Sequence, residues 1–170
     1  EVNLFFDWYL PFFKIKQTNQ KKQFNLIFSD YLKKIDFLPK VFVHRDYHID
    51  NLFFLKNRKG NFKCGWIDYQ DAVYGPDIYD LVSLCQDARI DVPKKVEGNL
   101  IKYFLKQKKI SQKNHYLFCY DIIGIQRHLK VLGIFCRLSK RDKKDIYLSH
   151  LPRVKKMLLS TLKKKEFKDL

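Results

Sequence analysis

The most informative segment of this chain is His44-Arg45-Asp46-Tyr47-His48-Ile49-Asp50-Asn51. It follows the short apolar run Val41–Val43 and leads into a second apolar run, Asn51–Leu55. A third polar group, Ile67-Asp68-Tyr69-Gln70-Asp71, ends the next apolar run along the chain. Polar side chains therefore gather where short predicted strands begin and end, which is the usual place for a functional site.

Turn-forming residues predict that two of these apolar runs pair with one another. Asn51–Leu55 and Cys64–Asp68 are separated by a linker that holds Asn57, Gly60 and Asn61. Two apolar runs joined by such residues are typical of a β-hairpin. We expect the hairpin to return Asp68 to the neighbourhood of Asn51.

Most of the remaining chain shows the spacing of helices. Apolar residues recur at helical intervals over these ranges: Gln23–Ile35, Asp77–Ala88 after Pro76, Val96–Gln107, His115–Leu138 and Leu151–Lys164. Glu1–Leu10, closed by Pro11, reads as the end of a helix. A small β-hairpin followed by a helical block predicts a mostly helical α+β fold. We expect one domain over 1–170, with the helices that lead in at 1–40, the polar loops at 41–89 and the helical block at 90–170.

Three oxygen-bearing side chains, Asp46, Asn51 and Asp68, match what phosphoryl transfer from ATP requires. A carboxylate must hold the attacking hydroxyl in line with the γ-phosphate, and Mg²⁺ must neutralise the charge that develops. Mg²⁺ prefers oxygen ligands, so one carboxylate and one amide oxygen would suit it. The alternative interpretation is that these residues only cap turns, as Asp and Asn often do.

The same residues carry a resemblance to the protein-kinase-like superfamily and, within it, to the aminoglycoside-phosphotransferase family. Protein kinases favour Asp-Phe-Gly at the metal loop, whereas this chain has Asp68-Tyr69-Gln70, which favours a small-molecule kinase. Longer strings resemble the bacterial anomeric kinases of N-acetylmuramate and N-acetylglucosamine, which serve cell-wall recycling. These strings are Phe6–Leu10, Val43–His48, Gly65–Ala72, Gly75–Pro76, Tyr79–Leu84, Gln86–Arg89, Gln126–Phe135 and His150–Val154.

This resemblance implies the C-terminal lobe of a protein-kinase-like fold, with ATP and Mg²⁺ as cofactors and an amino sugar as acceptor. The implied roles are Asp46 as catalytic base, Asn51 and Asp68 as magnesium ligands, His44 and Asp80 as supports of the catalytic loop, and Gln70 and Asp71 as possible substrate contacts.

The resemblance also implies an N-terminal lobe that this chain does not contain. Such a lobe carries a glycine-rich loop and a strand lysine that bind the phosphates. The glycines here are scattered, at Gly60, Gly65, Gly75, Gly98, Gly124 and Gly133. Because the chain begins at Glu1 and its only methionine is Met157, we expect a piece of a longer protein or a processed one. A non-catalytic kinase-lobe fragment is the alternative.

Charge leaves a third function class open. The net charge is +16, from 34 Lys and Arg against 18 Asp and Glu. An excess of this size suits an anionic partner, so a basic nucleic-acid-binding module is a further alternative. Most of the lysines are spread along the chain, and only Lys163–Lys165 form a tight run, which favours a solvated surface.

Cysteine usage and hydropathy predict a cytoplasmic protein. The cysteines Cys64, Cys85, Cys119 and Cys136 form no Cys-x-x-Cys pair and lie among apolar residues, so we expect reduced, buried thiols and no zinc site. The sequence has no apolar run long enough for a membrane span, and its start has no signal-peptide pattern.

Overall fold

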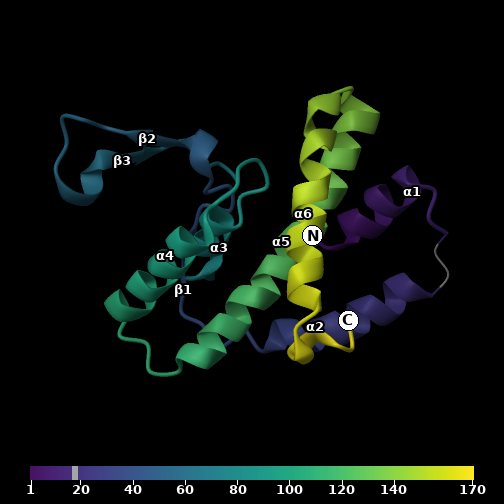
Figure 1. The fold of residues 1–170 in the computed structure, drawn as a ribbon, viewed down its shortest axis with the longest axis horizontal. Helices are drawn as coiled ribbons and strands as arrows, with labels where there is room; N and C mark the ends of the chain where they lie inside the picture. Colours follow the sequence, from purple (N-terminus) through teal and green to yellow (C-terminus); the bar gives the residue numbers. More distant parts are fainter. Residues whose placement is uncertain (17–18) are drawn as a thin grey trace. The chain divides into compact units, whose positions relative to one another are not determined.

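The computed structural model describes residues 1–16 and 19–170, and helices dominate this part of the chain. The elements in chain order are a π-helical turn Phe5–Tyr9, α1 Leu10–Phe12, α2 Gln20–Lys33, β1 Lys40–Val43, a 3-10 turn Ile49–Asn51, β2 Leu52–Phe54, a 3-10 turn Gly60–Lys63, β3 Cys64–Trp66, β4 Val73–Pro76, α3 Tyr79–Cys85, α4 Lys94–Gln107, α5 Lys113–Asp142, a 3-10 turn Asp145–His150, α6 Leu151–Leu162 and a 3-10 turn Lys165–Phe167 (Figure 1). The prediction of a mostly helical chain is confirmed.

The described residues divide into two compact units. One unit is 37–116, and the other combines the two ends, 1–36 and 117–170. The unit 37–116 holds the four strands together with α3 and α4. All the site residues predicted from the sequence lie within this unit.

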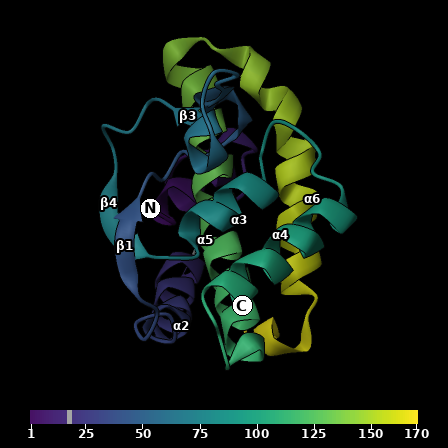
Figure 2. The same cartoon turned by 90° about the vertical axis from the view of Figure 1, so that its left-hand side faces the viewer.

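The strands of unit 37–116 form two antiparallel pairs. β2 pairs with β3, with Leu52 opposite Trp66. β1 pairs with β4, with Val43 opposite Val73, and Figure 2 shows these two strands side by side. A strand was predicted at β1, whereas none was predicted at β4, which contains Gly75 and Pro76. A proline is tolerated here because it stands at the end of a strand.

Helix α3 is shorter than the predicted range of Asp77–Ala88. At its start, the N–H of Asp77 bonds to the carbonyl of Pro39 at 2.9 Å, which continues the pairing of β1 and β4 past Pro76. At its end, a carboxylate oxygen of Asp87 accepts the N–H of Arg89 at 2.7 Å. A local side-chain bond of this kind competes with the helical bond, so the helix stops at Cys85.

The prediction that all four cysteines are buried is wrong at Cys64. This residue begins β3, where the two-stranded pair leaves side chains exposed, and its thiol is free. The other three cysteines are free and buried. Burial raises the pKa of Cys119 and of Cys136 to about 11, so both remain neutral thiols at pH 7.

The unit formed by the two chain ends has an aromatic core. Phe28 of α2 is 1% exposed, and the ring of Phe118 stacks on that of Phe167 with centroids 5.4 Å apart. Tyr120 of α5 is also buried in this unit, and Tyr116 is buried in unit 37–116, which confirms that these aromatic residues of α5 are core. In the described part of the chain, no helix is both long and apolar enough to cross a membrane.

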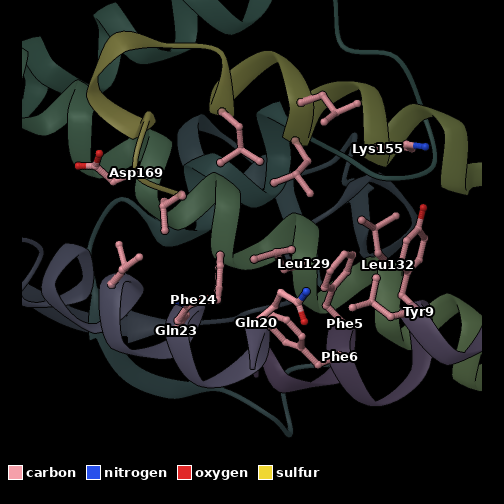
Figure 3. A pocket seen from close by; sticks show the side chains of 16 residues that line it. Phe5, Phe6, Tyr9, Gln20, Gln23, Phe24, Leu129, Leu132, Lys155 and Asp169 are labelled. Atoms are coloured by element: carbon pink, nitrogen blue, oxygen red, sulfur yellow. The ribbon is translucent and has the colours of Figure 1, made fainter. Parts of the chain in front are cut away.

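This unit also contains a pocket of about 520 Å³ that the sequence did not predict. Figure 3 shows Phe5, Phe6 and Tyr9 on one side, and Leu129 and Leu132 of α5 facing them. Leucines of α6 complete the lining. The pocket is mostly apolar, which distinguishes it from the polar loops of unit 37–116.

Two helical glycines differ in the room around them, which gives a matched test of the packing. A Cβ at Gly133 in α5 would clash with the backbone carbonyl group of Leu4, whereas a Cβ at Gly98 in α4 would meet nothing within 4 Å. We expect Gly133→Ala to lower the free energy of unfolding by about 1–3 kcal/mol through this clash. Gly98→Ala should raise it by about 0.5–1 kcal/mol through helix propensity. Urea unfolding of both variants checks this, and equal stabilities would contradict the close approach at Gly133.

Candidate active site

The carboxylate of Asp80 holds the start of the loop that follows β1. Its oxygens accept the backbone N–H of His44 at 2.8 Å and of Arg45 at 3.0 Å. Asp80 lies in the first turn of α3, so the helix fixes where these oxygens point. One side chain thus satisfies two consecutive backbone donors of the loop.

Two residues of the site adopt a backbone conformation that side chains disfavour. Arg45 has φ +74° and Asp68 has φ +67°, both in the left-handed region. A non-glycine residue in this region needs support from its surroundings, and such residues concentrate at functional sites. The bonds from Asp80 provide that support at Arg45.

Three hydrogen bonds join the loop after β1 to the loop after β3. His44 Nε2 lies 2.8 Å from the carbonyl of Ile67, and because a carbonyl can only accept, Nε2 is the donor. The N–H of Ile67 donates to the carbonyl of Asn51 at 3.1 Å. Arg45 Nη1 donates to the carbonyl of Asp71 at 3.1 Å. One backbone bond and two side-chain-to-backbone bonds therefore hold together the segments that carry Asp46, Asn51 and Asp68.

The contacts of Asn51 leave its amide oxygen as the atom for a cation. Its Nδ2 donates to the carbonyl of Asp46 at 3.0 Å and lies 3.4 Å from Nε2 of His48. Both contacts use the nitrogen, so Oδ1 is turned away from them. Asn51 is also buried, at 9% exposure, which restricts its side chain. This orientation fits a magnesium ligand.

Asp68 and its neighbours are more open to solvent. Asp68 is exposed, and its Oδ1 accepts the Nε2 of Gln70 at 3.0 Å. Gln70 and Asp71 are exposed too, whereas Asp46 is half-buried. In the described chain, no three His, Cys, Asp or Glu side chains gather into a metal site. A magnesium site with one aspartate and one asparagine would be of another kind, since phosphate oxygens and water would have to complete it.

Two side chains next to Asp46 have shifted pKa values. Burial, followed by the charge of Arg89, lowers the pKa of His48, while the carboxylates of Asp87, Asp46 and Asp50 oppose the shift. His48 is therefore neutral at pH 7, and its Nε2 can accept from Asn51. Burial, followed by the Cys64 thiol 3.6 Å away, raises the pKa of Tyr47 to about 12. Its phenol stays protonated.

Sequence reasoning gave no role to Arg45 or to Asp87. Arg45 connects the two loops, and Asp87 contacts the N–H of Ile49 in the turn that carries Asn51. The only sequence signal for Asp87 was its place in the string Gln86–Arg89. A buried acceptor for a distant backbone N–H leaves no spacing pattern, so it appears only in the structure.

Comparisons with known proteins place the chain in a family. A family model described as "Phosphotransferase enzyme family" matches residues 4–113. The N-acetylmuramate/N-acetylglucosamine kinase of Pseudomonas putida is 37% identical over 165 residues, which is 90% of this chain and 46% of that protein. The proteins of the same name from Neisseria meningitidis and Pseudomonas aeruginosa are 37% and 34% identical, again over 90% of this chain and over 47% and 46% of their own lengths.

The extent of these matches is sufficient to assign the family. The chain spans about half the length of the curated relatives it matches. The family model covers residues 4–113, which include both loops of the site. This chain belongs to the phosphotransferase enzyme family.

Proposed function

We propose that this chain carries the catalytic and metal-binding loops of an ATP-dependent kinase that phosphorylates the anomeric hydroxyl of an amino sugar. The observation that carries the proposal is the orientation of Asn51. Its amide nitrogen donates to the carbonyl of Asp46 and lies next to Nε2 of His48, so neither of these contacts uses its oxygen, which we propose as the ligand of a magnesium–nucleotide complex.

In the proposed reaction, the carboxylate of Asp46 accepts the proton of the sugar hydroxyl. The hydroxyl oxygen forms a bond to the γ-phosphorus while the bond between that phosphorus and the β,γ-bridging oxygen breaks, releasing ADP. Asn51 Oδ1 and the carboxylate of Asp68 would hold Mg²⁺, which neutralises charge on the phosphate oxygens when bound. The Asp80 carboxylate holds the backbone of the loop after β1, and the His44 side chain connects that loop to the carbonyl of Ile67 in the loop after β3.

The sugar assignment rests on the relatives. Proteins named N-acetylmuramate/N-acetylglucosamine kinase match this chain at 34–37% identity, which supports an amino sugar as the acceptor. Because those proteins are about twice as long, we propose that ATP is held jointly with a further lobe, and that the chain is the C-terminal lobe of a cytoplasmic enzyme. Gln70 and Asp71, exposed beside Asp68, are the proposed sugar contacts.

An assay of the intact gene product tests this function. With ATP and Mg²⁺, we expect N-acetylglucosamine or N-acetylmuramate to stimulate ADP release. Phosphorylation of the anomeric oxygen removes the reducing end, so the reducing-sugar signal should fall in proportion to ADP formed. ADP release without loss of the reducing end would show that a hydroxyl other than the anomeric one is phosphorylated. Absence of sugar-dependent ADP release would favour a non-catalytic protein.

A further inference from the structure

We infer that Asp87 is a positioning residue for Asn51, acting as a second brace on the catalytic loop. The inference rests on the proposed function, since it assigns a purpose to the orientation of Asn51. Asp80 holds the start of the loop at His44 and Arg45. Asp87 holds its other end, at the 3-10 turn Ile49–Asn51.

The environment of Asp87 requires partners for its charge. The residue is 3% exposed, and a buried carboxylate is stable only when donors compensate for lost water. Its Oδ1 accepts the N–H of Arg89 at 2.7 Å, and its Oδ2 faces the N–H of Ile49 at 3.4 Å. The carboxylate thus connects the turn after α3 to the first residue of the turn that carries Asn51.

A second contact strengthens the same connection. Arg89 Nε lies 3.5 Å from Oδ2 of Asp50, the residue after Ile49. The segment 87–89 therefore contacts two consecutive residues of the 3-10 turn, one through a carboxylate and one through a guanidinium. Neither contact involves an atom that the proposed reaction uses, so both act on position alone.

The position of this turn determines which end of the Asn51 amide faces the metal. His48 precedes the turn, and its Nε2 lies 3.4 Å from Asn51 Nδ2. On the other side, the carbonyl of Asp46 accepts from the same nitrogen. If the turn moved, this pair of contacts would be lost and the amide could rotate, replacing a ligand oxygen with a nitrogen that binds no cation.

The test is the magnesium requirement of Asp87→Ala in the intact gene product. Loss of a residue that orients a metal ligand typically lowers metal affinity about 10–100-fold. We expect the Mg²⁺ concentration for half-maximal activity to rise at least about 10-fold, with a smaller fall in kcat at saturating Mg²⁺. Asp87→Asn keeps one acceptor oxygen and should give an intermediate value. Amide hydrogen exchange at Ile49 should become faster in both variants.

The matched control is Asp77→Asn, a second buried carboxylate of the same unit. Asp77 lies 3.1 Å from Lys108 Nζ, and its side chain is 1% exposed. Its substitution should lower stability without changing the magnesium requirement or the exchange at Ile49. If amide hydrogen exchange at Ile49 is unchanged in Asp87→Ala, Asp87 does not position the turn that carries Asn51, whether or not the protein is active. An equal rise in magnesium requirement for Asp77→Asn would also overturn it, because loss of stability would then explain both. A wild-type protein without kinase activity would instead refute the proposed function.

Discussion

Asp46→Asn should lower kcat about 10³-fold in the intact gene product, because the amide cannot accept the proton of the attacking hydroxyl. The backbone carbonyl of Asp46 accepts hydrogen bonds from the Asn51 side-chain amide and from the N–H of His48. Because the substitution changes only the Asp46 side chain, both bonds survive it. The KM for ATP should therefore stay within about threefold of wild type, since positioning of the nucleotide is unaffected. Steady-state kinetics with N-acetylglucosamine measure both quantities.

The control for this prediction is Asp30→Asn on α2, an exposed carboxylate 2.7 Å from Lys33. It removes the same charge outside the site and should leave kcat unchanged. Thermal unfolding of both variants separates chemistry from folding. A kcat for Asp46→Asn within a few-fold of wild type, with the protein folded, would show that this carboxylate is not the base.

Asp80→Ala should have the second-largest effect, acting on both stability and turnover. It leaves the N–H groups of His44 and Arg45 without their acceptors, at a cost of about 1–3 kcal/mol for each group that remains dry. Arg45, with φ +74°, also loses the support for its unfavourable backbone. We expect kcat to fall about 100-fold as the loop that carries Asp46 loses its fixed position.

Urea unfolding and kinetics on Asp80→Ala and Asp80→Asn check this account. Asn keeps one acceptor oxygen, so it should lose less stability and less activity than Ala. A variant that unfolds more easily but keeps wild-type kcat would mean that Asp80 stabilises the fold without positioning Asp46.

The sequence predicted the parts of this molecule that depend on local pattern. Helical spacing located α2, α4, α5 and α6 to within a few residues, and turn formers predicted that Asn51–Leu55 and Cys64–Asp68 would pair. The spacing of Asp46, Asn51 and Asp68 also predicted that their segments would meet, and hydrogen bonds to backbone carbonyls join them. Each of these features depends on residues that are close together in the sequence.

The features that the sequence did not predict depend on contacts between distant residues. β4 became a strand because it pairs with β1, although Gly75 and Pro76 argue locally for a turn. Cys64 is exposed because β3 belongs to a two-stranded pair, although its neighbours are apolar. Asp87 acquired a role because a turn 38 residues earlier presents an N–H to it. Local composition contains none of this information.

The most direct measurement replaces Mg²⁺ with paramagnetic Mn²⁺ in the intact gene product, bound with a non-hydrolysable ATP analogue. Proton relaxation by Mn²⁺ falls off steeply with distance, so NMR signals near the ion broaden first. Convergence of Asp46, Asn51 and Asp68 on the nucleotide predicts the strongest broadening at the Asn51 side-chain amide and at the backbone amides of residues 46 and 68. Broadening centred elsewhere, such as on Lys163–Lys165, with these signals unchanged, would contradict it.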